Sequence, residues 1–145
     1  MKAVIQVVDD AKLSVDEKLV SEIKKGIVVF FCVEKNDEED KLDFFAKKLA
    51  NLRLFPDANG KTNLSVKDVG GEILLVSQFT LAGECEHGNR PSFITAELPE
   101  RANEMYKKLG SLVEKYDISV KYGVFGADMK ITQTNAGPFT VLLSK

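Results

Sequence analysis

The sequence predicts a single α+β domain in which two helices cover one side of a largely antiparallel or mixed sheet. Its segments follow the order strands, helix, strands, helix, strands. The chain has 145 residues without repeats or an interdomain linker, so we expect one domain over residues 1–145. The composition, 44% hydrophobic and 29% charged, is that of an ordinary globular protein.

The first part of the chain is expected to form strands. Residues 2–8 are rich in β-branched side chains. Two further strand-like segments, 12–15 and 18–21, flank Asp16-Glu17, which predicts a tight hairpin. The continuous apolar run 27–33 is typical of a strand that is buried on both faces.

Two amphipathic helices are predicted from apolar residues spaced three and four apart. Asn36 and Asp37 are candidate N-caps of the first helix, which ends before the turn at 57–60. Pro99 suits the start of the second helix. The expected buried stripes are Leu42, Phe45, Ala46, Leu49 and Leu52 in the first helix and Ala102, Met105, Tyr106, Leu109, Leu112, Val113 and Tyr116 in the second.

Further strands are expected at 72–77 and 118–122, with a loop at 82–92. The last strand or strands, within 129–143, contain Gly137-Pro138. Proline removes a backbone donor and glycine weakens a strand ladder, so a central strand usually avoids both. This step is therefore either a turn between two strands or backbone surface presented to a ligand.

Charge and hydropathy exclude several classes of protein. The net charge of −2 does not fit a strongly basic nucleic-acid binder, so any contact with nucleic acid has to be local. No apolar run approaches the roughly 18 residues of a membrane span, and the N-terminus has no signal-peptide pattern. We therefore expect a cytoplasmic protein with no membrane partner.

Neither cysteine indicates a metal site or an activated nucleophile. Cys32 lies in the apolar run and is expected to be a buried hydrophobic residue. Cys85 lies next to the only histidine, His87, in an acidic loop, and two neighbouring ligands do not make a zinc site. Since phosphate-binding and metal-binding motifs are also absent, we expect no metal and no cofactor.

The first candidate for chemistry is Ser77-Gln78-Phe79-Thr80, which follows directly on a buried strand. Ser77 and Thr80 provide hydroxyls, Gln78 provides an amide, and backbone N–H groups at this strand end could stabilise an oxyanion. Read by local chemistry alone, the segment also fits a polar junction between a strand and a loop.

Two further groups could bind a nucleotide. Arg90 and Phe93 lie in one loop and could contact phosphate and stack on a base, although an arginine that covers apolar surface fits equally well. Phe125 and Met129 lie among small residues, a composition found in adenine pockets and in hydrophobic cores.

Together these segments resemble the D-aminoacyl-tRNA deacylase family. Two separated motifs carry the resemblance, Ser77-Gln78-Phe79-Thr80-Leu81 and Asn135-x-Gly137-Pro138-x-Thr140. Supporting blocks lie at 2–6, 51–55, 90–93 and 123–129, so the similarity spans essentially the whole chain. Either motif alone is weak evidence for the family, but the two motifs in this order, with the supporting blocks, are a specific signal.

The resemblance implies a compact, β-barrel-like α+β homodimer that hydrolyses the ester of D-aminoacyl-tRNA and spares L-aminoacyl-tRNA. In this family the Gly-Pro bond is cis and enters the active site of the partner subunit. Carried over here, Gly137 and Pro138 test chirality beside Ser77 to Thr80, and Phe125 and Met129 lie near the terminal adenosine. The ribose 2′-hydroxyl of the substrate is thought to assist catalysis, and glycyl-tRNA mischarged on tRNA(Ala) is a further expected substrate, because glycine has no side chain to exclude.

The chain departs from the family pattern near the Gly-Pro step. Val7 stands where an arginine commonly helps to hold this element, and Ala136 stands where an aspartate is frequent. Two alternatives therefore stay open at this point: a proofreading deacylase with relaxed chirality that acts on other mischarged tRNAs, and a non-catalytic tRNA-binding module on the same scaffold.

Overall fold

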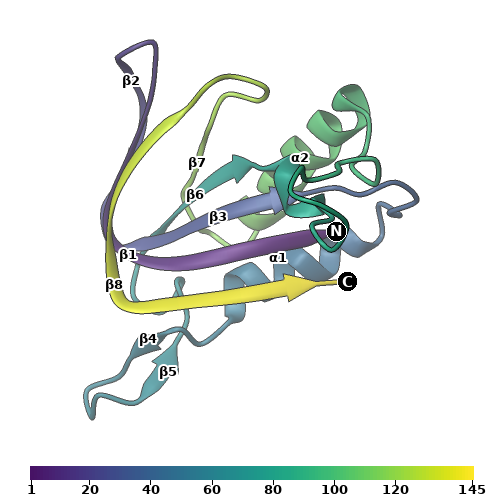
Figure 1. Ribbon diagram of the computed structural model, residues 1–145. Helices are drawn as coiled ribbons and strands as arrows, with labels where there is room; N and C mark the ends of the chain where they lie inside the picture. The colour runs from purple at the N-terminus through teal and green to yellow at the C-terminus, as the bar shows by residue number, and fades with distance from the viewer.

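A six-stranded mixed sheet forms the centre of the protein (Figure 1), whose computed structural model describes all residues, 1–145. The strand order is β2-β1-β3-β6-β7. β2 and β3 pair with different halves of one edge of β1, and β8 pairs along its opposite edge. β1 is antiparallel to β2, β3 and β8, whereas β3-β6 and β6-β7 are parallel. The sheet bends until it nearly closes into a barrel, which confirms the predicted fold class.

The elements follow the predicted order. The strands are β1 (Lys2–Val15), β2 (Lys18–Ile23), β3 (Gly26–Cys32), β4 (Phe55–Pro56), β5 (Thr62–Leu64), β6 (Glu72–Ser77), β7 (Val120–Tyr122) and β8 (Lys130–Ser144). The helices are α1 (Lys41–Asn51), α2 (Pro99–Glu114) and the short 3-10 turn η1 (Phe79–Ala82). β4 and β5 form a separate small hairpin, which the sequence pattern did not reveal beyond its turn.

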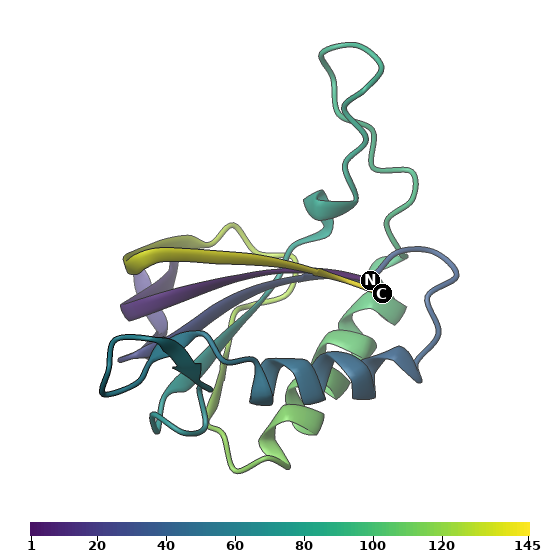
Figure 2. The same ribbon diagram turned by 90° about the horizontal axis from the view of Figure 1, so that it is seen from below.

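Both helices pack on one face of the sheet, as Figure 2 shows from below. The larger core lies between this face and the helices and includes Ile5, Phe31 and Phe45. A second cluster lies on the opposite face, where Val28 and Leu74 are fully buried. β3 and β6 are therefore buried on both sides, as the continuous apolar run predicted for β3. Neither helix is long and apolar enough to cross a membrane.

The first strand is longer than predicted. The segments expected at 2–8 and 12–15 form one strand, which pairs with β3 as far as Val8 and with β2 from Ala11 onward. Because β8 pairs along the other edge of both halves, β1 continues through the change of partner. The hairpin at Asp16-Glu17 is confirmed, and both turn residues have positive φ, as a type I′ turn requires.

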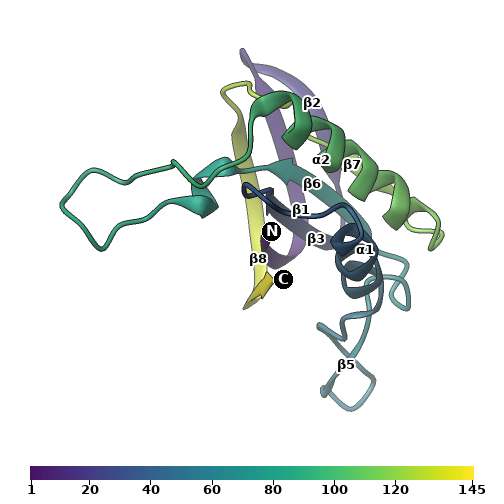
Figure 3. The ribbon, with the colours of Figure 1, turned by 90° about the vertical axis from the view of Figure 1, so that its right-hand side faces the viewer.

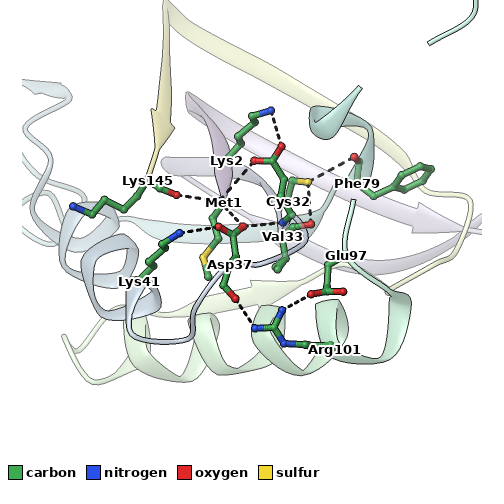
Figure 4. A network of polar contacts seen from close by, with 11 residues as sticks. Met1, Lys2, Cys32, Val33, Asp37, Lys41, Phe79, Glu97, Arg101 and Lys145 are labelled. Atoms are coloured by element: carbon green, nitrogen blue, oxygen red, sulfur yellow. Dashed lines mark hydrogen bonds and ion pairs between the residues drawn. The ribbon is translucent and has the colours of Figure 1, made fainter. Parts of the chain in front are cut away.

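The predicted start of the first helix is wrong. α1 begins at Lys41, with Asp40 rather than Asn36 or Asp37 at the N-cap position. The carboxylate of Asp37 is instead bound to the N-terminal ammonium of Met1 at 2.5 Å and to Lys41 Nζ at 3.1 Å (Figure 4). The Glu34 N–H also donates to this carboxylate, at 2.8 Å. The long-range ion pair determines the role of Asp37, and a local capping pattern cannot reveal it.

Gly137-Pro138 is not a turn between two strands. The residues before and after it both pair with β1, so β8 is one strand with an outward bulge. The register passes from Gln6 opposite Thr140 to Val8 opposite Asn135. The Gly137-Pro138 peptide bond is cis, as the family resemblance implied, and both residues are exposed. The bulge therefore presents its backbone away from the sheet.

Candidate active site

A cavity of about 530 Å³ opens where the carboxyl ends of β3 and β6 meet the start of α2. Because neighbouring parallel strands end at the same edge of a sheet, Cys32 and Ser77 come together there although they lie far apart in sequence. The segment that follows β7 closes the cavity with Phe125 and Met129. Most of the lining residues are hydrophobic, as in typical small-molecule sites.

The segment after β6 forms one wall of the cavity. Ser77, Gln78 and Phe79 line it, and the Gln78 N–H is anchored to the Phe31 carbonyl of β3 at 2.8 Å. The chain then turns into η1, which leaves the Phe79 ring 57% exposed at the cavity. Thr80 does not line the cavity; its exposed hydroxyl accepts a hydrogen bond from Gln78 Nε2. The predicted motif therefore forms a rigid strand end with a short helical turn.

Of the predicted nucleotide-binding residues, Phe125 and Met129 line the cavity directly. Phe93 lies outside it but packs edge-to-face on Phe79, with ring centroids 5.2 Å apart. Arg90 lies farther out, in the exposed loop 83–95, which projects from the body of the molecule (Figure 3). The structure thus brings Phe125, Met129 and Phe93 to the cavity or its rim, whereas Arg90 lies in the projecting loop.

Gly137 and Pro138 do not line this cavity. They lie on β8, the edge strand, and face outward. Gly137 has φ +114°, a region that side chains rarely adopt. Within one chain, the Gly-Pro step and the Ser77 to Thr80 segment are therefore separate surfaces.

Comparison with known proteins identifies the chain's relatives. The family model described as D-Tyr-tRNA(Tyr) deacylase matches residues 4–144. The chain belongs to this family. It is 50% identical to a D-aminoacyl-tRNA deacylase of Geotalea daltonii over 99% of this chain and 95% of that protein, and 47% identical to one of Syntrophus aciditrophicus over 99% and 96%.

Two solved structures share the fold of this chain. One described as c-Myc DNA Unwinding Element Binding Protein superposes with a TM-score of 0.92 at 37% identity, covering 100% of this chain and 99% of that one. A probable eukaryotic D-amino acid tRNA deacylase shares the fold, with a TM-score of 0.83 at 17% identity over 98% and 97% of the two chains. Family membership confirms the hydrolase class that the resemblance implied.

Two cavity residues of this deacylase family member were assigned only to the core from sequence. Cys32 lines the cavity, and its thiol lies 3.6 Å from the Phe79 carbonyl. Burial raises the pKa of the Cys32 thiol to about 11, so it is a neutral donor rather than a nucleophile. Tyr106 also lines the cavity and donates a hydrogen bond to the Leu75 carbonyl at 2.7 Å. The sequence places Cys32 at the end of a buried strand, but only the structure shows that this strand runs parallel to the one that ends at Ser77.

Histidine and metal-binding groups do not gather at this site, although the carboxylates of Glu97 and Asp128 line the cavity. The only histidine, His87, is 85% exposed in the projecting loop, beside Glu84. Cys85 is exposed in the same loop. No group of three or more His, Cys, Asp and Glu side chains lies close enough together to hold a metal ion. The cavity offers hydroxyl, amide, thiol and backbone groups to a substrate, together with apolar rings. Of its two carboxylates, Glu97 is paired with Arg101, and Asp128 belongs to the segment between β7 and β8.

Proposed function

We propose that the protein hydrolyses the ester bond of D-aminoacyl-tRNA to a free D-amino acid and tRNA. The observation that carries this proposal is the cavity at the Ser77 to Phe79 wall, in a chain whose relatives are named D-aminoacyl-tRNA deacylases. An aminoacyl ester is already activated, so positioning, a polarised carbonyl and a delivered water suffice for its hydrolysis. Such an activity serves translation quality control in the cytoplasm.

Thr80 acts by positioning rather than as a nucleophile. A threonine nucleophile needs a neighbouring base to take its proton, and the partner of its hydroxyl is the Gln78 amide, which donates. The N–H groups of Phe79 and Thr80 begin a helical turn and have no partner within it, so they suit a developing oxyanion. Ser77 and Gln78 orient the aminoacyl group along the same wall.

The terminal adenosine binds against the rings and thioether on the opposite side of the cavity. Phe125 and Met129 offer apolar surface for a base, and Phe93 supports Phe79 at the rim. Arg90 contacts phosphate from the projecting loop, where it provides a local positive charge in a chain of net charge −2. This division places tRNA along the face that carries the loop.

Gly137 and Pro138 form the chirality gate, defined here as the exposed backbone of these two residues. Since the gate does not line the cavity of its own chain, a second copy has to supply it. Main-chain atoms held close to the substrate Cα leave room for hydrogen but not for an L side chain. Glycyl-tRNA(Ala) passes such a gate, because glycine has no side chain.

The proposal predicts a homodimer. Gel filtration with light scattering should give twice the 16.0 kDa chain mass at assay concentrations. Dilution below the dissociation constant should reduce specific activity in parallel with the dimer fraction. A monomer with full activity would contradict the contribution of a second copy to the site.

The activity itself is tested with matched aminoacyl-tRNAs. Purified protein should release D-tyrosine from D-Tyr-tRNA, leave L-Tyr-tRNA intact, and release glycine from Gly-tRNA(Ala). Comparable hydrolysis of the D and L esters would instead indicate a deacylase with relaxed chirality. Tight tRNA binding without turnover would indicate a binding module.

A further inference from the structure

The bulge that carries the gate has little support from the strand beside it. Four residues, 136–139, are inserted opposite the single residue Val7 of β1. The Val7 side chain is apolar and only 5% exposed within the larger core, so it offers no polar contact to the bulge. Ala136 and Phe139 pack against the larger core, whereas Gly137 and Pro138 between them project into solvent. The position of these two residues therefore depends on how their neighbours and the two ends of the bulge are held.

A chain of side-chain amides joins these two ends. Gln133 Nε2 donates to Asn135 Oδ1 at 2.6 Å and to Gln6 Oε1 at 2.8 Å. Gln6 Nε2 in turn donates to Thr140 Oγ1 at 3.4 Å. Asn135 is the last paired residue before the bulge, and Thr140 is the first paired residue after it. The amides thus connect one end of the bulge to the other across β1.

The strand register explains why these side chains meet. Gln6 lies directly opposite Thr140, and Asn135 lies directly opposite Val8, on the face of the sheet that carries the second hydrophobic cluster. Gln133 lies two residues before Asn135 on β8, and alternate residues of a strand share one face. The four linked side chains, Gln6, Gln133, Asn135 and Thr140, therefore lie on one face of the sheet, beside the second hydrophobic cluster.

Gln133 is a costly residue at this place. Its Oε1 is buried and has no hydrogen-bond partner. An unpartnered buried polar atom destabilises the folded state, and an apolar side chain of similar size would avoid that cost. What glutamine provides instead is the pair of N–H contacts to Gln6 and Asn135, which argues for a role in placing the bulge rather than in stability.

We propose that Gln6 and Gln133 form an amide bridge that fixes both ends of the bulge and so holds Gly137 and Pro138 where they discriminate D from L substrates. They are positioning residues, because they act through the gate and do not touch the reacting atoms. This inference rests on the proposed function. Because the residue opposite the bulge is the apolar Val7, two neutral amides hold the gate in this protein.

The test is Gln133→Leu, measured as the ratio of kcat/KM for D-Tyr-tRNA to that for L-Tyr-tRNA. The variant should fold with an unchanged or raised melting temperature, while this ratio falls at least about tenfold, since displacements near 1 Å can change rates a hundredfold. Thr132→Leu is the matched control. Thr132 is the exposed neighbour of Gln133 on β8, so this change should leave the ratio as it is in the unmodified protein.

A double-variant comparison separates the bridge from general weakening of the strand. Gln6→Leu alone should lower the ratio as well, and the double variant Gln6→Leu/Gln133→Leu should be no worse than the more affected single variant, because both remove the same bridge. Additive losses, an unchanged ratio, or an equal fall in kcat/KM for both substrates would overturn the inference. If the unmodified protein itself fails to prefer the D ester, the proposed function fails first, and this inference falls with it.

Discussion

Replacing Gly137 with alanine is expected to reduce kcat/KM for D-Tyr-tRNA by about a hundredfold or more while the protein remains folded. At φ +114° an added Cβ would lie 2.9 Å from the Phe139 backbone nitrogen, closer than such atoms approach in real structures. The backbone has to shift, and this segment lies on an exposed bulge, so the shift moves the gate more than the core. Steady-state kinetics with D-Tyr-tRNA and L-Tyr-tRNA measure the effect.

Gly60→Ala is the matched control for Gly137→Ala. Gly60 also has a positive φ, +74°, but an added Cβ meets nothing within 4 Å there. It lies in the turn between β4 and β5, and only the general strain of a side chain at positive φ is expected. Activity retained in Gly137→Ala, or lost to the same extent in Gly60→Ala, would count against the gate.

Replacing Asp37 with alanine is expected to lower the free energy of unfolding by about 3–5 kcal/mol, the usual effect of removing one partner of a buried ion pair. The Met1 ammonium is fully buried and the Asp37 carboxyl is 7% exposed, so the ammonium would lose its closest counter-charge without gaining water. Asp37 also connects Lys41 of α1 to Met1, the residue before β1 (Figure 4). Urea denaturation of the two proteins gives the difference.

Asp40→Ala provides the comparison for Asp37→Ala. Asp40 is exposed, lies three residues away and makes no capping hydrogen bond, so its loss should change the unfolding free energy by no more than about 1 kcal/mol. Equal effects of the two substitutions would show that the buried pair does not stabilise the fold.

The contribution of Asp37 should also depend on pH. Burial by itself raises the pKa of this carboxyl, but hydrogen bonds from the Met1 ammonium, the Glu34 N–H and Lys41 outweigh burial and hold the pKa below its ordinary value. A carboxyl with a lowered folded-state pKa stabilises the protein above its unfolded pKa, about 3.9, and loses that contribution as the pH falls through the folded value. The stability difference between the unmodified protein and Asp37→Ala should therefore be constant near neutral pH and shrink below about pH 4.

Local chemistry was enough to predict several elements. The hairpin at Asp16-Glu17 follows from two short strands around a tight turn, and both helices follow from apolar residues at helical spacing. The run at 27–33 predicted a strand buried on both faces, and the run at 72–77 predicted a further strand; both are confirmed. In each case the residues that decide the structure lie within a few positions of one another.

Part of the candidate site was also accessible to sequence analysis. Ser77, Gln78 and Phe79 stand at the end of a buried strand and line the cavity, together with Phe125 and Met129. Cys32 was missed because its proximity to Ser77 comes from the parallel pairing of β3 with β6, which has no local signature. The amides of Gln6 and Gln133 were missed for the same reason, since 127 positions separate them in the chain.

The sequence by itself determined the fold class, the family and the motifs, because periodicity, turn chemistry and motif order are written in neighbouring residues. Only the tertiary structure decided what Asp37 and Gly137-Pro138 do. Asp37 binds an ammonium 36 positions away instead of capping a helix, and Gly137-Pro138 interrupts one strand instead of joining two. Both outcomes depend on which distant segment packs alongside, and the energy of those contacts exceeds the local preference that the sequence shows.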